Sequence, residues 1–296
     1  MSTERVPAPE GNSTPHPTTT FPSRSFDGQP VVHSAAGATM PALGLGTWRL
    51  DEQATERMTR QALDLGYRHI DTAQMYDNEA GVGRGISASG VDRSEIFVTT
   101  KIADDCHEPD ALVESVEQSL RALRTDHVDL LLIHWPTEYD RIGATAAALA
   151  NVHAGGLTRH IGLSNFTIEQ LDEVEHMAPF EALQVECHPF LQQAELRRWC
   201  DEHGWIFTAY SPIARGDVLH DDTLHDIATR HHTPATSVAL AWLLARGVAA
   251  IPKSGDPDHL AANWGARNLQ LTEDDMARID ALDEGSRVVD PDGAPW

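Results

Sequence analysis

The chain has few cysteines and no long apolar run, and each shortage excludes a class of protein. None of its 296 residues fall in an apolar run of about 18 or more, so we expect no transmembrane helix. The N-terminus lacks a basic-then-apolar signal pattern, which predicts a cytoplasmic protein. Three widely spaced cysteines, Cys106, Cys187 and Cys200, fit neither a disulfide framework nor a zinc site. We therefore expect no bound metal.

Positive charge is also scarce. The chain has 22 Lys and Arg residues against 45 Asp and Glu residues, and a formal net charge of −23. This balance disfavours nucleic acid and anionic membranes as partners, because neither offers counter-charge. Only two of the basic residues are lysines, Lys101 and Lys253. Lysine is a compact charge whose pKa shifts readily on burial, so both positions are candidate sites.

Composition divides the chain into a tail and a domain. Residues 1–29 are rich in Pro, Ser and Thr with little apolar periodicity, which is typical of a disordered tail. We expect one domain over residues 30–296. The short apolar stretches 31–32 and 38–41, separated by a small-residue turn around Gly37, predict a hairpin at its start.

Short apolar runs then alternate with helical patterns. Such alternation is typical of a parallel (β/α)8 barrel, a TIM barrel. A doubly wound sheet is the alternative, but Gly81, Gly83 and Gly85 do not have the spacing of a dinucleotide-binding glycine motif. The expected strands are 43–46, 69–71, 96–100, 128–134, 161–164, 182–186, 206–210 and 249–251, and the expected helices are 51–65, 109–123, 168–176, 194–203, 219–231, 237–246 and one starting near 257.

Four groups at successive strand ends indicate a catalytic site. Functional groups of such barrels lie at the carboxyl ends of the strands, where this chain has Asp71, Lys101 and His134, with Tyr76 shortly after Asp71. Taken singly, each has an ordinary structural explanation. Together they could make Tyr76 a general acid, since a nearby ammonium lowers a tyrosine pKa and an Asp can hold that ammonium in place. His134 could orient an acceptor oxygen, so reduction of a carbonyl by hydride fits.

Later strand ends offer groups suited to a nicotinamide cofactor. Ser164, Asn165 and Gln184 supply hydroxyl and amide groups for a carboxamide, and Tyr210 offers a flat face for ring stacking. Lys253 and Ser254 precede the helix near residue 257 and make a candidate phosphate site. Ser254 and Asn263 are individually weak signals, because polar residues are common at helix starts.

Several motifs recur in order along the chain, at residues 66–76, 99–101, 131–136, 162–166, 209–212 and 251–254. Through these motifs the sequence resembles the aldo-keto reductases from about residue 43 to its C-terminus. Within that family, stretches 71–79, 123–126 and 287–293 are most similar to small bacterial reductases of the 2,5-diketo-D-gluconate reductase B and methylglyoxal reductase type.

The resemblance implies a barrel that binds NADPH without a Rossmann fold. It implies Tyr76 as proton donor, Lys101 and Asp71 as the groups that tune it, and His134 as the group that orients the carbonyl. It places Ser164, Asn165 and Gln184 on the carboxamide, Tyr210 against the ring, Ser211 and the residues after it on the pyrophosphate, Lys253 and Ser254 on the adenosine 2′-phosphate, Asn263 on adenine, and Trp48 and Trp135 in the substrate pocket.

Departures from the family pattern affect cofactor choice and pocket size. His259 stands where many relatives have an Arg, and neutral His cannot make the bidentate charged contact of Arg. We therefore expect NADPH with NADH use possible. Ala103 replaces a common aromatic residue, and the loop 137–141 and the C-terminal tail are short, which predicts a roomy, open site that Trp296 could cover.

The sequence predicts a monomeric reductase of small aldehydes, 2-oxoaldehydes or keto sugars. Two alternatives remain. A metal-dependent hydrolase on the same barrel would need a His-x-His strand end, and the chain has none. The second alternative is a reductase-like module that senses a nucleotide cofactor with negligible turnover. The four-residue site argues against it.

Overall fold

The computed structural model describes residues 25, 26 and 28–296. The disordered tail expected over residues 1–29 thus lies outside the described residues except at 25, 26, 28 and 29. At one of these positions the expectation differs from the structure. Phe26 is only 7% exposed, and its ring lies 6.5 Å from that of Phe97 in an edge-on contact. The packed part of the chain therefore begins before residue 30.

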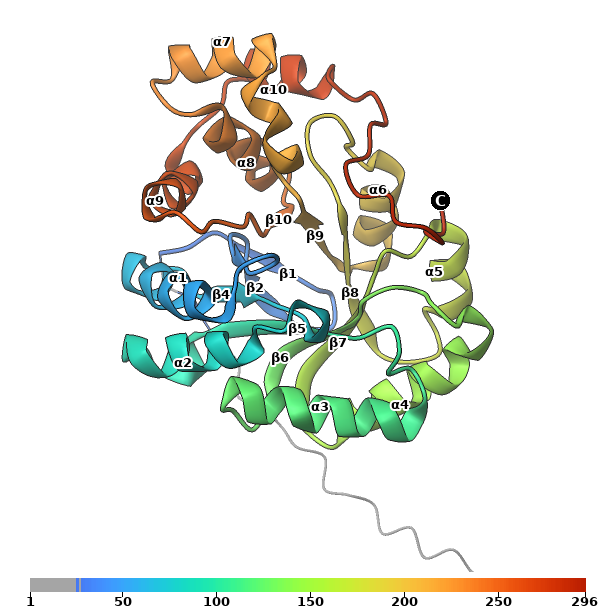
Figure 1. Ribbon diagram of the computed structural model, residues 1–296. Helices are drawn as coiled ribbons and strands as arrows, with labels where there is room; N and C mark the ends of the chain where they lie inside the picture. The colour runs from blue at the N-terminus through green and yellow to red at the C-terminus, as the bar shows by residue number, and fades with distance from the viewer. Residues whose placement is uncertain (1–24, 27) are drawn as a thin grey trace, which may run out of the picture.

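Eight parallel strands form a barrel, which confirms the predicted fold (Figure 1). The strands follow one another in chain order from β3 to β10, and parallel bridges from Leu43 to Ala250 and from Gly46 to Lys253 join the last strand to the first. The central strands are buried throughout, as expected for a parallel sheet covered on its outer face. The strands are β3 (Leu45–Gly46), β4 (His69–Asp71), β5 (Phe97–Ile102), β6 (Val128–Ile133), β7 (Thr158–Ser164), β8 (Phe180–Glu186), β9 (Ile206–Tyr210) and β10 (Ala249–Ala250).

Helices surround the barrel (Figure 1). The sequence predicted most of them but missed α2, α4 and α10. Helix α4 is apolar on nearly all sides and so lacks the one-sided pattern that reveals a surface helix. The helices are α1 (Glu52–Leu65), α2 (Glu79–Ser89), α3 (Pro109–Leu123), α4 (Ile142–Ala154), α5 (Ile168–Val174), α6 (Ala194–His203), α7 (Asp222–Arg230), α8 (Ala235–Ala245), α9 (Pro257–Gly265) and α10 (Glu273–Asp280).

Local sequence signals fix where several helices begin and end. The Asp51 carboxylate accepts a hydrogen bond from the Ala54 amide at the start of α1, and Gly66 ends that helix with φ +112°. At the start of α5, Thr167 and Gln170 form a reciprocal capping box. Gly66 thus ends α1 shortly before β4 begins, and the capping box starts α5 shortly after β7 ends.

The glycine-rich stretch lies inside α2 and serves helix packing. A Cβ on Gly81 would lie 2.4 Å from the Glu52 carbonyl oxygen of α1, and one on Gly83 would lie 2.5 Å from the Ala122 carbonyl oxygen of α3. The glycines therefore let α2 approach both neighbouring helices closely. This packing role agrees with the absence of a dinucleotide-binding glycine spacing.

The predicted hairpin closes the amino end of the barrel. Strands β1 (Val31–His33) and β2 (Thr39–Pro41) pair antiparallel, with Val32 opposite Met40. Met40 is fully buried and forms an apolar cluster with Phe26 and with residues of the barrel strands, most of them near the amino ends of those strands. That end is therefore filled, which leaves the carboxyl ends of the strands for a site. Among the described residues, no helix is long and apolar enough to span a bilayer.

Candidate active site

The structure brings Asp71, Tyr76, Lys101 and His134 together at the carboxyl end of the barrel. Lys101 Nζ donates to Asp71 Oδ1 at 2.5 Å, to the Thr72 carbonyl at 2.8 Å and to Tyr76 Oη at 3.4 Å. Asp71 and Lys101 are each 1% exposed, so the charges of the pair are removed from water. A buried pair keeps its charges only with such additional hydrogen bonds.

Tyr76 is held by a short turn that the sequence analysis did not single out. It ends the 3₁₀ helix η1 (Gln74–Tyr76) that follows β4. Just beyond, the buried Asn78 donates to the Thr47 and Leu50 carbonyls at 2.9 and 3.0 Å and accepts from Thr72 Oγ1 at 3.0 Å. Asn78 therefore ties the turn that carries Tyr76 to the loop after β3.

Burial sets the protonation state of Tyr76 more strongly than the sequence suggested. Burial raises the pKa of the Tyr76 phenol. The Lys101 ammonium lowers it, as expected, but does not cancel the effect of burial. Burial also disfavours the ammonium of Lys101, but Asp71 and Tyr76 outweigh burial and raise its pKa. At neutral pH Tyr76 therefore carries a proton beside a charged lysine.

His134 is neutral and incompletely bonded. Burial, with a smaller contribution from Lys101, holds the pKa of His134 well below its ordinary value of 6.5. Its Nδ1 is buried and has no hydrogen-bond partner among the described residues. Its ring centroid lies 5.7 Å from that of Tyr76 at an interplanar angle of 73°. Such an unsatisfied buried nitrogen is uncommon in folded proteins, which makes His134 a candidate functional residue.

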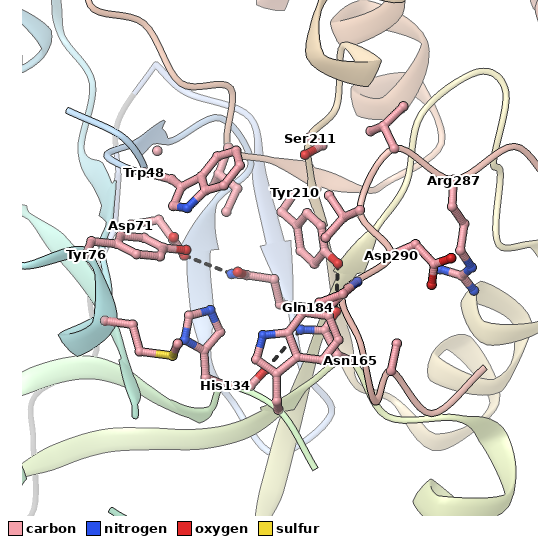
Figure 2. A pocket seen from close by; sticks show the side chains of 18 of the residues that line it. Trp48, Asp71, Tyr76, His134, Asn165, Gln184, Tyr210, Ser211, Arg287 and Asp290 are labelled. Atoms are coloured by element: carbon pink, nitrogen blue, oxygen red, sulfur yellow. Dashed lines mark hydrogen bonds between the residues drawn. The ribbon is translucent and has the colours of Figure 1, made fainter. Parts of the chain in front are cut away.

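A chain of hydrogen bonds joins the predicted carboxamide-binding residues to this group. Gln184 Nε2 donates to Asp71 Oδ2 at 2.8 Å, and Tyr210 Oη donates to Asn165 Oδ1 at 2.8 Å (Figure 2). Asn165 Nδ2 donates to the His134 carbonyl at 2.9 Å and to Ser164 Oγ at 3.1 Å. Asn165 has φ +66°, the left-handed region, which Asn tolerates better than most residues. These bonds therefore connect residues at the ends of five strands, namely β4, β6, β7, β8 and β9.

One cavity of about 1130 Å³ contains most of the predicted residues. It exceeds the roughly 300–1,000 Å³ of ordinary small-molecule pockets, so a dinucleotide and a substrate could share it. Lys101 and Ser164 lie buried behind its wall, and Ser254, His259 and Asn263 also lie outside its lining. The predicted residues that line it are Trp48, Asp71, Tyr76, His134, Trp135, Asn165, Gln184, Tyr210, Ser211 and Lys253.

The start of α9 differs from a simple phosphate site. Ser254 Oγ is occupied locally, since it donates to the Asp256 carbonyl at 2.7 Å and accepts from the Asp256 amide at 3.1 Å. The Asp256 carboxylate accepts from the amides of Asp258 and His259 at 2.9 and 3.0 Å. A carboxylate of the chain thus already uses the amides that a phosphate would take. Lys253 is exposed beside this turn.

The C-terminal segment forms a wall that the sequence analysis missed. We name residues 287–296 the C-terminal strap. Residues 287–295 line the cavity, and the Trp296 ring lies 5.6 Å from the Trp135 ring. In Figure 2, Arg287 and Asp290 lie on the side of the cavity away from Tyr76. The expectation of an open site was therefore wrong on this side. Trp296 contacts Trp135, which lines the cavity, but does not line the cavity itself.

Two arginines flank Trp48 at another edge of the cavity. The guanidinium carbons of Arg49 and Arg215 lie 4.2 and 4.9 Å from the Trp48 ring centroid, within the range of cation–π contacts. Arg215 comes from the loop after β9, where Ser211, Ala214 and Arg215 all have positive φ. These contacts join the loops after β3 and β9 across the cavity, and all three side chains line it.

Fold and site together define a class of protein, a TIM barrel with a buried Asp–Lys pair and a tyrosine beside a cavity large enough for a dinucleotide. In the described part of the chain, no group of three or more His, Cys, Asp or Glu residues is placed to hold a metal ion. The comparisons with known proteins name the family. The model of the aldo/keto reductase family matches residues 42–284, so the chain belongs to that family.

Several known proteins are similar to this chain over most of its length and most of their own. Methylglyoxal reductase DkgB of Escherichia coli O157:H7 is 42% identical over 259 residues, 86% of this chain and 97% of that protein. Glyoxal reductase of Bacillus subtilis (strain 168) is 39% identical over 85% of this chain and 92% of its own length. A crystal structure of a putative 2,5-diketo-D-gluconic acid reductase B has a TM-score of 0.85 at 40% identity and covers 89% and 96% of the two chains.

The protein is therefore an enzyme of the aldo/keto reductase family, an oxidoreductase that reduces carbonyl groups with a nicotinamide cofactor. The family match begins at residue 42 and covers the strands that carry the four central residues.

Proposed function

We propose that the enzyme reduces small aldehydes, 2-oxoaldehydes such as methylglyoxal, and keto sugars to alcohols, with NADPH as its main cofactor. The observation that carries the mechanism is the contact between the buried Asp71–Lys101 pair and the Tyr76 hydroxyl. The relatives named as methylglyoxal and glyoxal reductases support the substrate class. A nicotinamide cofactor, when bound, supplies the hydride for the carbonyl carbon.

The protein's task in this reaction is to supply a proton to the carbonyl oxygen. Tyr76 gives up its phenol proton as negative charge develops on that oxygen, and Lys101 stabilises the phenolate that remains. Asp71 keeps the ammonium in place through its 2.5 Å contact. His134 is neutral, so it positions the oxygen by hydrogen bonding without competing as an acid.

The other predicted residues are assigned to the cofactor and the substrate. Asn165, Gln184 and Ser164 are proposed to hold the carboxamide, and the Tyr210 ring to stack on the nicotinamide. Ser211 and the positive-φ loop after it are proposed for the pyrophosphate, and Trp48 and Trp135 for the substrate. The hydrogen bond from Gln184 to Asp71 supports this, because it connects the carboxamide position directly to the proton-donor group.

The phosphate end of the site supports a relaxed choice between NADPH and NADH. Lys253 is the cation proposed for the 2′-phosphate, with Ser254 and His259 beside it and Asn263 near adenine. Asp256 places a carboxylate at the same turn, and backbone hydrogen bonds from His259 and Asp258 keep its pKa low. A negative charge there repels a 2′-phosphate and leaves NADH unaffected, so we propose that NADH is also accepted.

The test is cofactor oxidation with methylglyoxal and, separately, with a bulky aryl ketone. Wild-type protein should oxidise NADPH, and Tyr76→Phe should lose about 10²–10⁴-fold in kcat because it lacks the proton. Tyr139→Phe is the matched control, since the Tyr139 hydroxyl bonds Glu173 outside the cavity. Full turnover by Tyr76→Phe would refute the mechanism.

Tight cofactor binding without turnover on any carbonyl would instead support a cofactor-sensing module. Fluorescence titration of NADPH into the same preparations separates the two results, because it reports binding whether or not the substrate is reduced. A monomeric state and a cytoplasmic location stay predictions of the sequence, and the first can be measured by light scattering on the same samples.

A further inference from the structure

The C-terminal strap is anchored by a buried carboxylate that the reaction itself does not use. Glu186, the last residue of β8, is 0% exposed. Its Oε1 accepts from the Val288 amide at 2.6 Å, and its Oε2 accepts from the Val289 amide at 3.1 Å. His188 Nε2 lies 2.9 Å from Oε1 and must be the donor, because a carboxylate only accepts.

These contacts connect the strap to the strand that carries Gln184. Side chains two residues apart on a strand point to the same face, so Glu186 lies beyond Gln184 on the face that carries the site. Gln184 bonds Asp71, while Glu186 bonds the strap. One strand therefore fixes both the proton-donor group and the opposite wall of the cavity.

The loop after β8 supports the base of the strap as well. The Phe190 carbonyl accepts from the amides of Glu284 and Ser286 at 3.2 and 3.0 Å, and the Gln192 amide donates to Asp283 Oδ1 at 3.2 Å. These bonds end just before residue 287. Beyond it, the two amides held by Glu186 begin the stretch that lines the cavity and ends with Trp296 against Trp135.

We propose that Glu186 is a positioning residue for substrate: it fixes the C-terminal strap and so sets the size and affinity of the carbonyl pocket. His188 donates a further hydrogen bond to the same carboxylate. Two peptide amides converge on one buried charge, and charge-assisted hydrogen bonds of this kind are about twice as strong as neutral ones. Without the carboxylate, both amides lose their acceptor and the wall beside the substrate loosens.

Glu186→Gln tests the proposal with little change of shape. Its amide nitrogen cannot accept, so at least one strap amide loses its partner. With methylglyoxal, KM should rise about tenfold while kcat changes less than about twofold, and the ratio of kcat/KM for the aryl ketone to that for methylglyoxal should rise. Equal changes in kcat and kcat/KM, or no change in either, would overturn the proposal.

Glu181→Gln is the matched control on the same strand. Glu181 is also buried and hydrogen-bonded, to Ser34 Oγ at 2.5 Å and His160 Nδ1 at 2.6 Å, but it lies at the amino end of β8. Glu181→Gln should leave KM unchanged, whatever its effect on the stability of the fold. If Glu181→Gln raises KM as much as Glu186→Gln, the effect is a general loss of packing and the proposal fails.

Amide exchange of the strap gives a readout that does not need turnover. In Glu186→Gln the amides of Val288 and Val289 should lose at least about tenfold of their protection, while Glu181→Gln keeps it. The substrate effect rests on the proposed function, but this measurement does not, so the two can fail separately. Unchanged protection in Glu186→Gln would overturn the proposal even if the enzyme reduces methylglyoxal.

A double-substitution cycle covers the case in which Glu186→Gln folds poorly. Val288→Pro removes one donor from the strap side and should by itself raise KM in the same direction. If Glu186 acts through the strap, the doubly substituted protein should resemble the more impaired single one. If KM of the doubly substituted protein rises by the product of the two single effects, the proposal is overturned.

Discussion

The two ends of the barrel each bury an aspartate, and the chain treats the two carboxylates differently. At the amino end, Asp129 is 0% exposed and lies 2.9 Å from Arg93 Nη2 and 3.3 Å from Arg159 Nε, and it also accepts from the Val98 amide. At the carboxyl end, Asp71 is paired with Lys101, which also reaches Tyr76. Two arginines thus contact the Asp129 carboxylate, whereas the Asp71 carboxylate pairs with a lysine that also contacts the Tyr76 hydroxyl.

We propose that the difference separates a structural ion pair from a catalytic one. Arginine stays charged and makes several directed hydrogen bonds, which suits a cluster that only holds β5, β6 and β7 together. Lysine presents a compact charge that can shift toward a neighbouring oxygen. This chain uses lysine only at positions 101 and 253, both at the carboxyl end of the barrel.

The largest expected effect follows from removing the buried cation at the carboxyl end, Lys101. Lys101→Met leaves Asp71 buried without its charge partner and Tyr76 without the group that stabilises its phenolate. We expect kcat to fall by about 10²–10⁴-fold and the free energy of unfolding to fall by about 3–5 kcal/mol. Steady-state kinetics and urea unfolding measure the two losses.

Lys253→Met is the natural comparison, because Lys253 is the other lysine and is exposed. It should raise the KM for NADPH and leave kcat and the free energy of unfolding almost unchanged. If Lys253→Met proved as inactive as Lys101→Met, the separation between proton-donor group and phosphate site would be wrong.

Removing the structural carboxylate should affect stability alone. Asp129→Asn leaves the guanidinium groups of Arg93 and Arg159 facing a neutral amide in a buried setting. We expect a loss of about 3 kcal/mol in the free energy of unfolding, with kcat/KM unchanged at temperatures where the protein is folded. A drop in kcat/KM without a loss of stability would show that the amino end of the barrel is coupled to the site.

How much of this could be predicted from sequence depends on whether a side chain or the backbone carries the signal. Asp71, Lys101 and His134 were found because rare or charged residues follow apolar strands. Glu186 was seen only as part of a strand, since its partners are the main-chain amides of residues 288 and 289, which leave no mark in the sequence. Its ligands come from about a hundred residues further along the chain, at a separation that local patterns do not report.

The phosphate site shows a signal that was available and missed. An aspartate directly before Pro257 is a typical helix start, so its carboxylate could be expected to bond the first amides of α9. The capping box of Thr272 and Asp275 would likewise have revealed α10. The net pKa of Tyr76, by contrast, depends on the depth of burial, which no short motif gives.

The lowered pKa of His69 predicts that acid destabilises the fold at the amino end of the barrel. Its ring is buried between the Pro41 carbonyl and Thr99 Oγ1, and burial lowers its pKa from 6.5 to about 4. The unfolded chain therefore binds the proton more tightly, and the free energy of unfolding should fall by about 3 kcal/mol as pH drops from about 6.5 to 4. Urea unfolding of wild type and His69→Asn across this range measures it.

The contribution of His69 is the difference between the two pH profiles. His69→Asn should be less stable at pH 7 but lose less stability on acidification, because the substituted side chain does not titrate. His134 also has a lowered pKa and adds an acid loss of the same sign to both proteins. Parallel profiles would mean that the His69 proton is not excluded from the folded state.

The smallest expected effect lies at the start of α9 and compares the two halves of the carboxyl end. The proton-donor half is buried, so its charges act at low dielectric, whereas Asp256 and Lys253 are exposed and screened by salt. Asp256→Asn keeps a side-chain oxygen that can cap the helix and removes the negative charge. We expect the preference for NADPH over NADH, as a ratio of kcat/KM values, to rise about fivefold. The gain should shrink at high salt, and Asp222→Asn in the first turn of α7, far from Lys253 in the chain, should leave the ratio unchanged. An unchanged ratio in Asp256→Asn would mean that the carboxylate turns away when the 2′-phosphate binds, so that Lys253 alone reads that group.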